Sequence, residues 1–243
     1  NLTIDTGATL DTTLANSYGI TLLGNWANSG TFNKQSGTVT FNGDATGKTI
    51  NSGASGFYTL TINSPAGTGS WTLDTNHLTT LTTLNVTKGT LNTGTRNLGT
   101  ASSTTINVNG GILTGGGGTI NASTLAVSSG TLTAGSGAVN IGGGENPGTY
   151  THTAGTVDWT TNSGTLYYST SGSKTLPADT YYHVTLLFST ASGIYSLAGT
   201  TTINGNLVLG SGPSMGASLQ IAANDLIVNG NVSWGSYCSL SIT

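Results

Sequence analysis

The sequence GTFNKQSGTVTF, from Gly30 to Phe41, returns 118 residues later as GTYTHTAGTVDW, from Gly148 to Trp159. Both copies keep the same glycines, two threonines and one valine, and they exchange aromatic residues only for aromatic residues. Such repetition is typical of proteins that grow in one dimension, because each unit buries its apolar face only against its neighbours. This phrase therefore predicts a tandem-repeat protein.

The match between the two copies continues after a change in loop length. GKTI, from Gly47 to Ile50, aligns with SKTL, from Ser173 to Leu176. FYTLTI, from Phe57 to Ile62, aligns with the YYHVTL that begins at Tyr181. Length changes that fall between strands are expected when outer loops vary while stacked coils stay in register. We therefore predict one continuous stack rather than two separate cores.

The repeated phrases also define where the units begin. We divide the chain into the end of a preceding unit (residues 1–29), a first unit (30–147) and a second unit (148–243), all within one solenoid. The sequence has no initiator Met, and both of its ends read as strands. We therefore expect it to be part of a longer polypeptide.

The composition favours ordered β structure with an almost uncharged surface. Charged residues make up 5% of the 243 residues and the net charge is -3, whereas charged residues are roughly 25% of an average soluble domain. Disordered chains usually combine high net charge with few β-branched residues, but this chain is rich in Thr, Val and Ile. We expect no membrane insertion, because no run of about 18 apolar residues occurs. Nucleic acid is not expected as a partner either, because the cations are scattered, at Lys34, Lys48, Lys88, Arg96 and Lys174.

Apolar and polar residues alternate in short stretches, which is the period of β-strands. Many stretches follow the phrase Gly-Thr-apolar, as at Gly37 to Val39. The steps from Ile20 to Val39 and from Val39 to Leu60 are 19 and 21 residues, and an equivalent step of 18 leads from Leu2 to Ile20. This spacing suits a coil of two or three short strands, whereas serial immunoglobulin-like sandwiches would show antiparallel hairpins. We predict an all-β fold: a parallel β-helix (β-solenoid) of stacked coils, right-handed and without long helices.

The residues from Gly24 to Asn63 carry three phrases, GNWANSGTF, GTVTFNG and FYTLTIN, and Gly148 to Leu187 repeats them with substitutions. These phrases resemble the repeat of the β-strand-repeat, adhesin-like family of very large secreted surface proteins from bacteria and archaea. The resemblance implies a parallel β-helix, an extracellular or cell-surface location, and an adhesive or filamentous role. It implies no catalytic residues.

The chemistry-bearing residues do not form an obvious site. An enzyme on a β-helix needs carboxylates that converge on one face, whereas isolated acids in turns are explained by their capping of backbone amides. The three histidines lack the spacing of metal ligands. We therefore expect no enzyme activity, no catalytic or cofactor-binding residues and no metal. The residues concerned are Asp5, Asp11, Asp44, Asp74, Glu145, Asp158, Asp179, Asp225, His77, His152 and His183.

Two pairs of adjacent tyrosines are candidates for outward contacts. On a strand, Tyr167 and Tyr168 cannot both point inward, and the same holds for Tyr181 and Tyr182, so at least one of each pair faces outward. We take all four as candidate outward aromatics, suited to stacking on a sugar or packing against another filament. The tryptophans are expected inside the coils or at an end of the stack, at Trp26, Trp71, Trp159 and Trp234.

Thr-x-Thr pairs, such as Thr38 with Thr40 and Thr59 with Thr61, raise an alternative function. Threonines in ranks can form a flat hydroxyl lattice that binds ice, although these pairs are irregularly spaced along the sequence. A glycan- or ice-binding β-helix module is therefore the alternative hypothesis. A regular, solvent-facing ladder of threonines would favour ice, and a groove floored by two aromatic rings would favour a glycan.

The leading hypothesis is an extracellular structural protein that forms or extends a cell-surface filament or adhesin stalk. The last coil is similar in sequence to an early one, since DLIVNGNVSWGS, from Asp225 to Ser236, resembles GITLLGNWANSG, from Gly19 to Gly30. A solenoid exposes unpaired strand edges at its ends unless caps cover them. Copies, or further repeats of the same polypeptide, are therefore the expected head-to-tail partners, and surface glycans are a second candidate. The candidate junction residues are Leu2, Ile4, Leu240 and Ile242.

Overall fold

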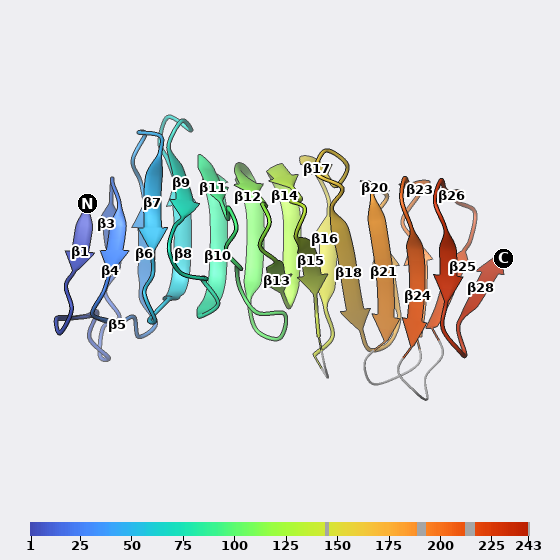
Figure 1. Cartoon of the computed structure of the whole chain (residues 1–243), viewed down its shortest axis with the longest axis horizontal. Coiled ribbons are helices and arrows are strands. Elements are labelled where there is room, and N and C mark those ends of the chain that lie inside the picture. Colours follow the sequence, from blue (N-terminus) through green and yellow to red (C-terminus); the bar gives the residue numbers. More distant parts are fainter. Residues whose placement is uncertain (144–145, 189–192, 212–216, 243) are drawn as a thin grey trace.

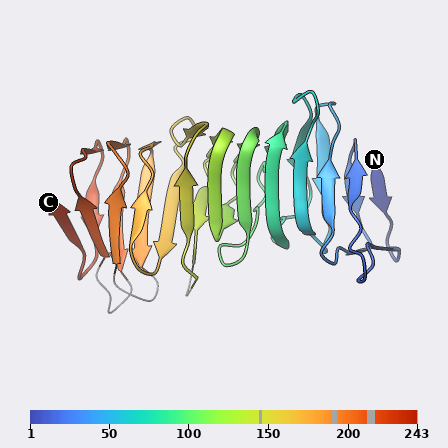
Figure 2. The same ribbon diagram turned by 180° about the vertical axis from the view of Figure 1, so that it is seen from behind.

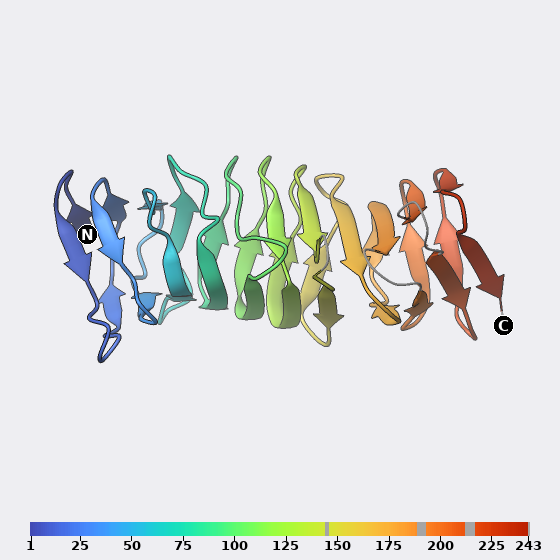
Figure 3. The same ribbon diagram turned by 90° about the horizontal axis from the view of Figure 1, so that it is seen from below.

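The chain forms a parallel β-solenoid in which coils stack along one long axis (Figure 1). The computed structural model describes residues 1–143, 146–188, 193–211 and 217–242. Seen from behind and from below, the strands lie side by side and the two termini lie at opposite ends (Figures 2 and 3). Among the described residues all paired strands are parallel, and no helix long and apolar enough to cross a membrane occurs. The all-β solenoid predicted from the sequence is thus confirmed.

Each coil contributes strands to three faces, which we number in chain order. The first face comprises β1 (Leu2–Ile4), β4 (Trp26–Asn28), β7 (Lys48–Asn51), β9 (Ser70–Leu73), β11 (Thr90–Asn92), the ends of β12 (Thr105–Thr114) and β14 (Thr124–Thr133), β17 (Thr156–Asp158), β20 (Thr180–Tyr181), β23 (Thr201–Ile203) and β26 (Leu226–Val228). The second face comprises β2 (Thr9–Asp11), β5 (Thr31–Asn33), β13 (Ile120–Ala122), β15 (Ala138–Ile141), β18 (Thr165–Thr170), β21 (His183–Phe188), β24 (Leu207–Ser211) and β27 (Val232–Trp234).

The third face is paired without a break over the first two thirds of the chain. It comprises β3 (Ile20–Leu22), β6 (Thr38–Phe41), β8 (Phe57–Asn63), β10 (Leu81–Lys88), the beginnings of β12 and β14, β16 (Thr149–His152), β19 (Lys174–Leu176), β22 (Gly193–Leu197), β25 (Ala217–Ile221) and β28 (Ser239–Ile242). Because β12 and β14 pair with strands of both the first and the third face, these two faces form one continuous sheet there.

The coil length varies because loops of different length join strands that remain in register. Residues that pair on neighbouring coils lie between 18 positions apart, as for Leu166 and Val184, and 27 positions apart, as for Val139 and Leu166. The predicted steps from Ile20 to Val39 and from Val39 to Leu60 are confirmed as pairs. The predicted step from Leu2 to Ile20 is wrong: Leu2 pairs with Trp26, and β1 and β3 lie on different faces of one coil.

The core is a single cluster of apolar side chains that runs along the axis of the solenoid. Alternation along each strand sends every second residue inward, and parallel pairing stacks these residues on those of the next coil. On the third face one inward column runs through Ile20, Val39, Leu60, Leu84, Ile106, Leu125 and Tyr150. Each fully buried Leu, Ile or Val contributes about 1.5–3 kcal/mol relative to an exposed side chain.

The repeated phrase does not lie on the same faces in its two copies. In the first copy the two strands are β5 and β6, on the second and third faces, whereas in the second copy they are β16 and β17, on the third and first faces. Both copies nevertheless contribute to one core. Both copies of the repeated phrase therefore form two strands joined by a turn, but the equivalent strands lie on different faces of the solenoid.

Glycines occupy the corner between the third and first faces, where the backbones of neighbouring coils come close together. Gly130 has a left-handed backbone conformation, with φ of 77°, and an added Cβ would lie 2.3 Å from the carbonyl oxygen of Gly111. The Cβ of an alanine at position 155 would likewise lie 2.6 Å from the oxygen of Gly130. Only glycine permits both the conformation and the approach.

We expect Gly130→Ala to destabilise the protein more than Gly67→Ala. Gly67 has a similar φ, 81°, but nothing lies within 4 Å of its added Cβ. Both changes carry the left-handed penalty of about 1–2 kcal/mol, and Gly130→Ala adds about 1–3 kcal/mol because neighbouring backbone has to move. Urea unfolding of the two variants measures the difference directly. Equal destabilisation would show that close coil stacking does not restrict this corner.

Candidate functional site

Backbone pairing on the third and first faces stops between two coils, at a place that we call the seam. Strands β16 and β17 end one sheet, and β19 and β20 begin two new ones, so the third and first faces are interrupted between these two coils. Only the second face continues across, through β15, β18 and β21. Side-chain contacts therefore have to hold the two parts together on the interrupted faces.

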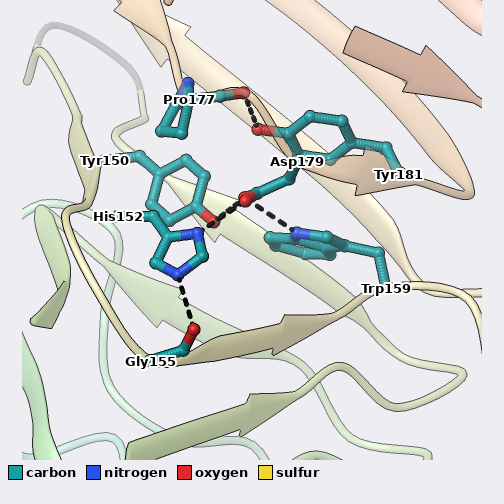
Figure 4. Close-up of polar contacts among 7 residues, drawn as sticks. All are labelled: Tyr150, His152, Gly155, Trp159, Pro177, Asp179 and Tyr181. Atoms are coloured by element: carbon teal, nitrogen blue, oxygen red, sulfur yellow. Dashed lines mark hydrogen bonds and ion pairs between the residues drawn. The ribbon is translucent and has the colours of Figure 1, made fainter. Parts of the chain in front are cut away.

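A buried network centred on Asp179 fills the seam (Figure 4). Tyr150 donates its hydroxyl hydrogen to Asp179 Oδ2 at 2.5 Å, and His152 Nδ1 lies 2.6 Å from Asp179 Oδ1. The indole Nε1 of Trp159 donates to Oδ2 at 3.4 Å. Asp179 is only 8% exposed, so its charge is compensated by these three partners rather than by water. From the next coil, Tyr181 donates to the carbonyl of Pro177 at 2.8 Å.

The register of β16 explains why a histidine lies here. His152 pairs with Val127, so it occupies an inward column. The other residues of this inward column are all apolar: Leu22, Phe41, Ile62, Val86, Val108 and Val127. Because β16 has no paired strand above it on the third face, the ring reaches Asp179 in the turn before β20. The other ring nitrogen, Nε2, lies 3.4 Å from the Gly155 carbonyl oxygen, so both nitrogens face acceptors.

The electrostatics of the seam keep its tyrosines neutral. Burial raises the pKa of Tyr150 well above its usual value, and the nearby charge of Asp179 raises it further. Burial likewise raises the pKa of Tyr181. Both phenols therefore stay hydrogen-bond donors. Ring packing adds to the cluster, since the rings of Tyr150 and Trp159 meet edge to face with centroids 6.0 Å apart.

An open hollow of about 520 Å³ adjoins the seam. Three residues of the seam network, Tyr150, His152 and Asp179, line it together with small and hydroxyl-bearing neighbours such as Thr151, Thr175 and Ala198. Both Asp179 oxygens already accept hydrogen bonds from the seam, two at Oδ2 and one at Oδ1. The arrangement suits structural cohesion. The expectation that the chain has no enzyme activity stays a prediction.

The structure brings together residues that the sequence left apart. His152 and Asp179 were expected to be isolated, yet they form the centre of the seam network. The position of His152 two residues after the inward-facing Tyr150 is a signal that could have placed its ring inside the stack. Nothing in the sequence indicates that Asp179, a turn residue 27 positions later, would meet it.

Of the four candidate outward tyrosines, one is exposed, one is half-buried and two are buried. Tyr168 and Tyr181 are 1% and 0% exposed, so the expectation that they face outward is wrong, because the alternation directs them into the core. Tyr167 is 40% exposed, and Tyr182 is half-buried beside the ring of His183. A hollow of about 210 Å³ beside Tyr167 has this tyrosine as its single aromatic wall, with His183 next to it. It is not a groove floored by two aromatic rings.

The tryptophans follow the sequence expectation. Trp26, Trp71 and Trp159 are fully buried, and Trp234 lies in the last coil with half of its surface exposed. In the first coils, the ring of Trp26 packs edge to face against Phe32 and Phe57, with centroids 4.8 Å and 5.1 Å away. These rings widen the core near one end of the solenoid.

The coil formed by β26, β27 and β28 presents an apolar hollow of about 310 Å³ to solvent. Of the candidate junction residues, Leu240 and Ile242 are 41% and 78% exposed here. At the other end Leu2 is half-buried and Ile4 is buried within its own coil. The hollow is lined by Leu207, Leu209, Ile221, Leu226, Val228, Val232, Trp234, Leu240 and Ile242.

Asp158, at the end of β17, is a turn residue of the kind that the sequence predicted. Hydrogen bonds from Thr161, and then from Thr160, lower the pKa of Asp158 to about 2. Its backbone partners lie 3.0 Å and 2.9 Å from Oδ1, at the nitrogens of Thr161 and Thr160. Since the folded pKa is below the unfolded value, the carboxylate stabilises the fold above about pH 4, and this contribution is lost as the pH falls to about 2.

We therefore expect the stability difference between the wild type and Asp158→Asn to shrink as the pH falls from about 4 to about 2. The expected change is about 1 kcal/mol, because solvent screening reduces the effect of a partly exposed group. Urea unfolding at a series of pH values measures it. Parallel pH profiles for the two proteins would contradict the assignment.

Searches with this chain against models of protein families, curated protein sequences and solved structures find no match. The class that the geometry defines is a parallel β-solenoid with an apolar end coil. The resemblance of Gly24 to Asn63 to adhesin-like repeats remains a resemblance.

Proposed function

We propose that this chain is an extracellular structural protein that forms or extends a cell-surface filament or adhesin stalk by head-to-tail stacking. The observation that carries the proposal is the β26–β28 coil, which exposes inward-aligned apolar side chains and three strands without a partner on one side. Exposed apolar patches with unpaired strand edges mark surfaces that associate. The occupant is another copy, or a further repeat of the same polypeptide.

The first coil of the chain matches this surface in its strand order and its apolar pattern. If the ladder continued into a second copy, β1, β2 and β3 of that copy would pair with β26, β27 and β28 of the first, one pair on each face. Leu226 and Val228 would then stack on Leu2 and Ile4, which continues an inward column. Because one end is unlike the other, such contacts are heterologous and propagate as a filament.

The proposed mechanism is mechanical. Parallel pairing gives a backbone hydrogen-bond ladder along the axis with a strand spacing of about 4.8 Å. A surface with 5% charged residues should hold its shape over a wide range of salt concentration, because few interactions in it are screened by ions. Extracellular localisation is part of the proposal and rests on the family resemblance. Surface glycans as additional partners stay a prediction.

Electron microscopy of negatively stained native material, with sedimentation over a range of concentrations, tests the proposal. We expect unbranched filaments with an axial repeat of roughly 50 Å per chain, since about ten coils stack at about 4.8 Å each. Sedimentation should show a mass that grows with concentration. Monomers alone at high concentration, or caps of other sequence over both ends in the native assembly, would contradict it.

A further inference from the structure

Outward-facing threonines form an unbroken column on the third face. The register pairs Thr38 with Thr59, Thr59 with Thr83 and Thr83 with Thr105, and the column continues through Thr124 to Thr149. These residues are irregularly spaced in the sequence because the loops between them differ in length. Parallel pairing nevertheless places them on successive coils, about 4.8 Å apart.

A second column lies beside the first, two residues further along each strand. Thr21 pairs with Thr40 and Thr40 with Thr61, and Thr151 ends the column on β16. Between them stand Asn85, Asn107 and Ala126. Neighbouring columns along a strand are about 6.6 Å apart, so the two columns make a two-dimensional array. We call this array, over β3, β6, β8, β10, β12, β14 and β16, the threonine face.

Most hydroxyls of the first column have no hydrogen-bond partner among the described residues. In the described part of the chain, the side chains of Thr38, Thr59, Thr83, Thr105 and Thr124 make no hydrogen bond within the protein. At the far end of the column, Thr149 accepts one from Lys174 at 3.3 Å. The asparagines differ, because Asn107 donates to Asn85 at 3.0 Å.

The array is uncharged, and its hydroxyls have restricted positions. No residue of the two columns carries a charge. Threonine is β-branched and stiff at χ1, and each side chain is flanked by its neighbours above and below. Pre-ordering reduces the entropy lost when many weak contacts form at once. Methyl groups and hydroxyls repeated on one face of the sheet can therefore hold water molecules in a repeating pattern.

We propose that the threonine face binds ice through this ordered layer of water. The hydroxyls repeat about every 4.8 Å across the strands and about every 6.6 Å along them, as β geometry requires, and such a regular array can order a layer of water. A polysaccharide is disfavoured as the ligand, because sugars are usually held by aromatic platforms and neither column contains an aromatic ring. The activity is additional to filament formation, and it uses the side of the solenoid rather than its end.

The first face supplies an internal comparison. Its outward column runs from Thr90 through Ile112 to Thr131, so an isoleucine interrupts the threonines. The neighbouring column contains Thr114 and Thr133 but ends at the charged Asp158. The first face therefore has similar chemistry but lacks an unbroken threonine column.

The test compares Thr83→Lys/Thr105→Lys with the matched variant Thr114→Lys/Thr133→Lys. Each pair occupies adjacent coils and is half-buried, so the two variants differ chiefly in the face that they alter. We measure the fraction of the full chain that enters a slowly growing ice hemisphere, together with inhibition of ice recrystallisation. We expect the wild type and the first-face variant to be taken up, and the threonine-face variant to lose uptake at least tenfold.

Circular dichroism melts establish that both variants are folded. Thr83→Val/Thr105→Val, which keeps shape and adds no charge, provides a second measurement if a lysine variant unfolds, and we expect it to weaken uptake. No uptake of the wild type, or equal loss in both lysine variants, would overturn the proposal. A third outcome would also overturn it: the wild type binds an insoluble polysaccharide but is not taken up into ice, and Thr83→Lys/Thr105→Lys abolishes the binding to the polysaccharide. Both lysine variants should still form filaments, which separates this proposal from the preceding one.

Discussion

A Leu240→Asp/Ile242→Asp variant is expected to lose filament assembly, with head-to-tail association weakened about 10²- to 10⁴-fold. Both side chains are exposed in the last coil and line its apolar hollow. Burying each of them at a junction contributes about 1.5–3 kcal/mol, and every 1.4 kcal/mol is a tenfold change in affinity. The two carboxylates would also have to be desolvated without a partner, which adds to the loss.

Ile227→Asp is the matched control for this variant. Ile227 lies in the same coil and is 47% exposed, but it does not line the hollow. Filament lengths measured by electron microscopy, and association measured by sedimentation, should therefore be nearly unchanged in Ile227→Asp. Far-ultraviolet circular dichroism should show intact coils in both variants. Filaments of normal length in the double variant would refute stacking through this end.

Asp179→Ala is expected to lower the free energy of unfolding by about 3–5 kcal/mol, because it removes a buried carboxylate that three neighbouring side chains share as their acceptor. Tyr150, His152 and Trp159 would be left with unpaired polar groups in the seam. The interrupted faces have no backbone ladder there to replace the lost contacts. Urea unfolding measures the total effect, and amide hydrogen exchange locates it.

Two further variants show whether the effect belongs to the network. Asp179→Asn keeps one acceptor oxygen and should cost less, about 1–3 kcal/mol. Asp225→Ala, at an exposed turn position, should change stability by less than about 0.5 kcal/mol. Faster exchange should begin in β16 and β19, on either side of the seam. A uniform increase along the whole solenoid, or no loss of stability in Asp179→Ala, would contradict this role.

Much of the fold could be predicted from the sequence, because the strand period is local. Alternation correctly places Leu60 and Ile62 inside and their threonine neighbours outside, whatever the rest of the chain does. The same rule requires that one member of each tyrosine pair be exposed, but alternation alone did not identify which one. The neighbouring coil decides this, since Tyr168 stacks in register with the buried Ile141 and Leu186.

The sequence by itself determined the class of the fold, its apolar core and its uncharged surface, because these follow from composition and from a period of two residues. The tertiary structure decided which strands share a face, and hence the pairing of Leu2 with Trp26, the threonine column and the contact of His152 with Asp179. The physical reason is that loop length varies from coil to coil. A local pattern fixes which way a side chain points, whereas its neighbours across coils depend on the hydrogen-bond register between strands about twenty residues apart.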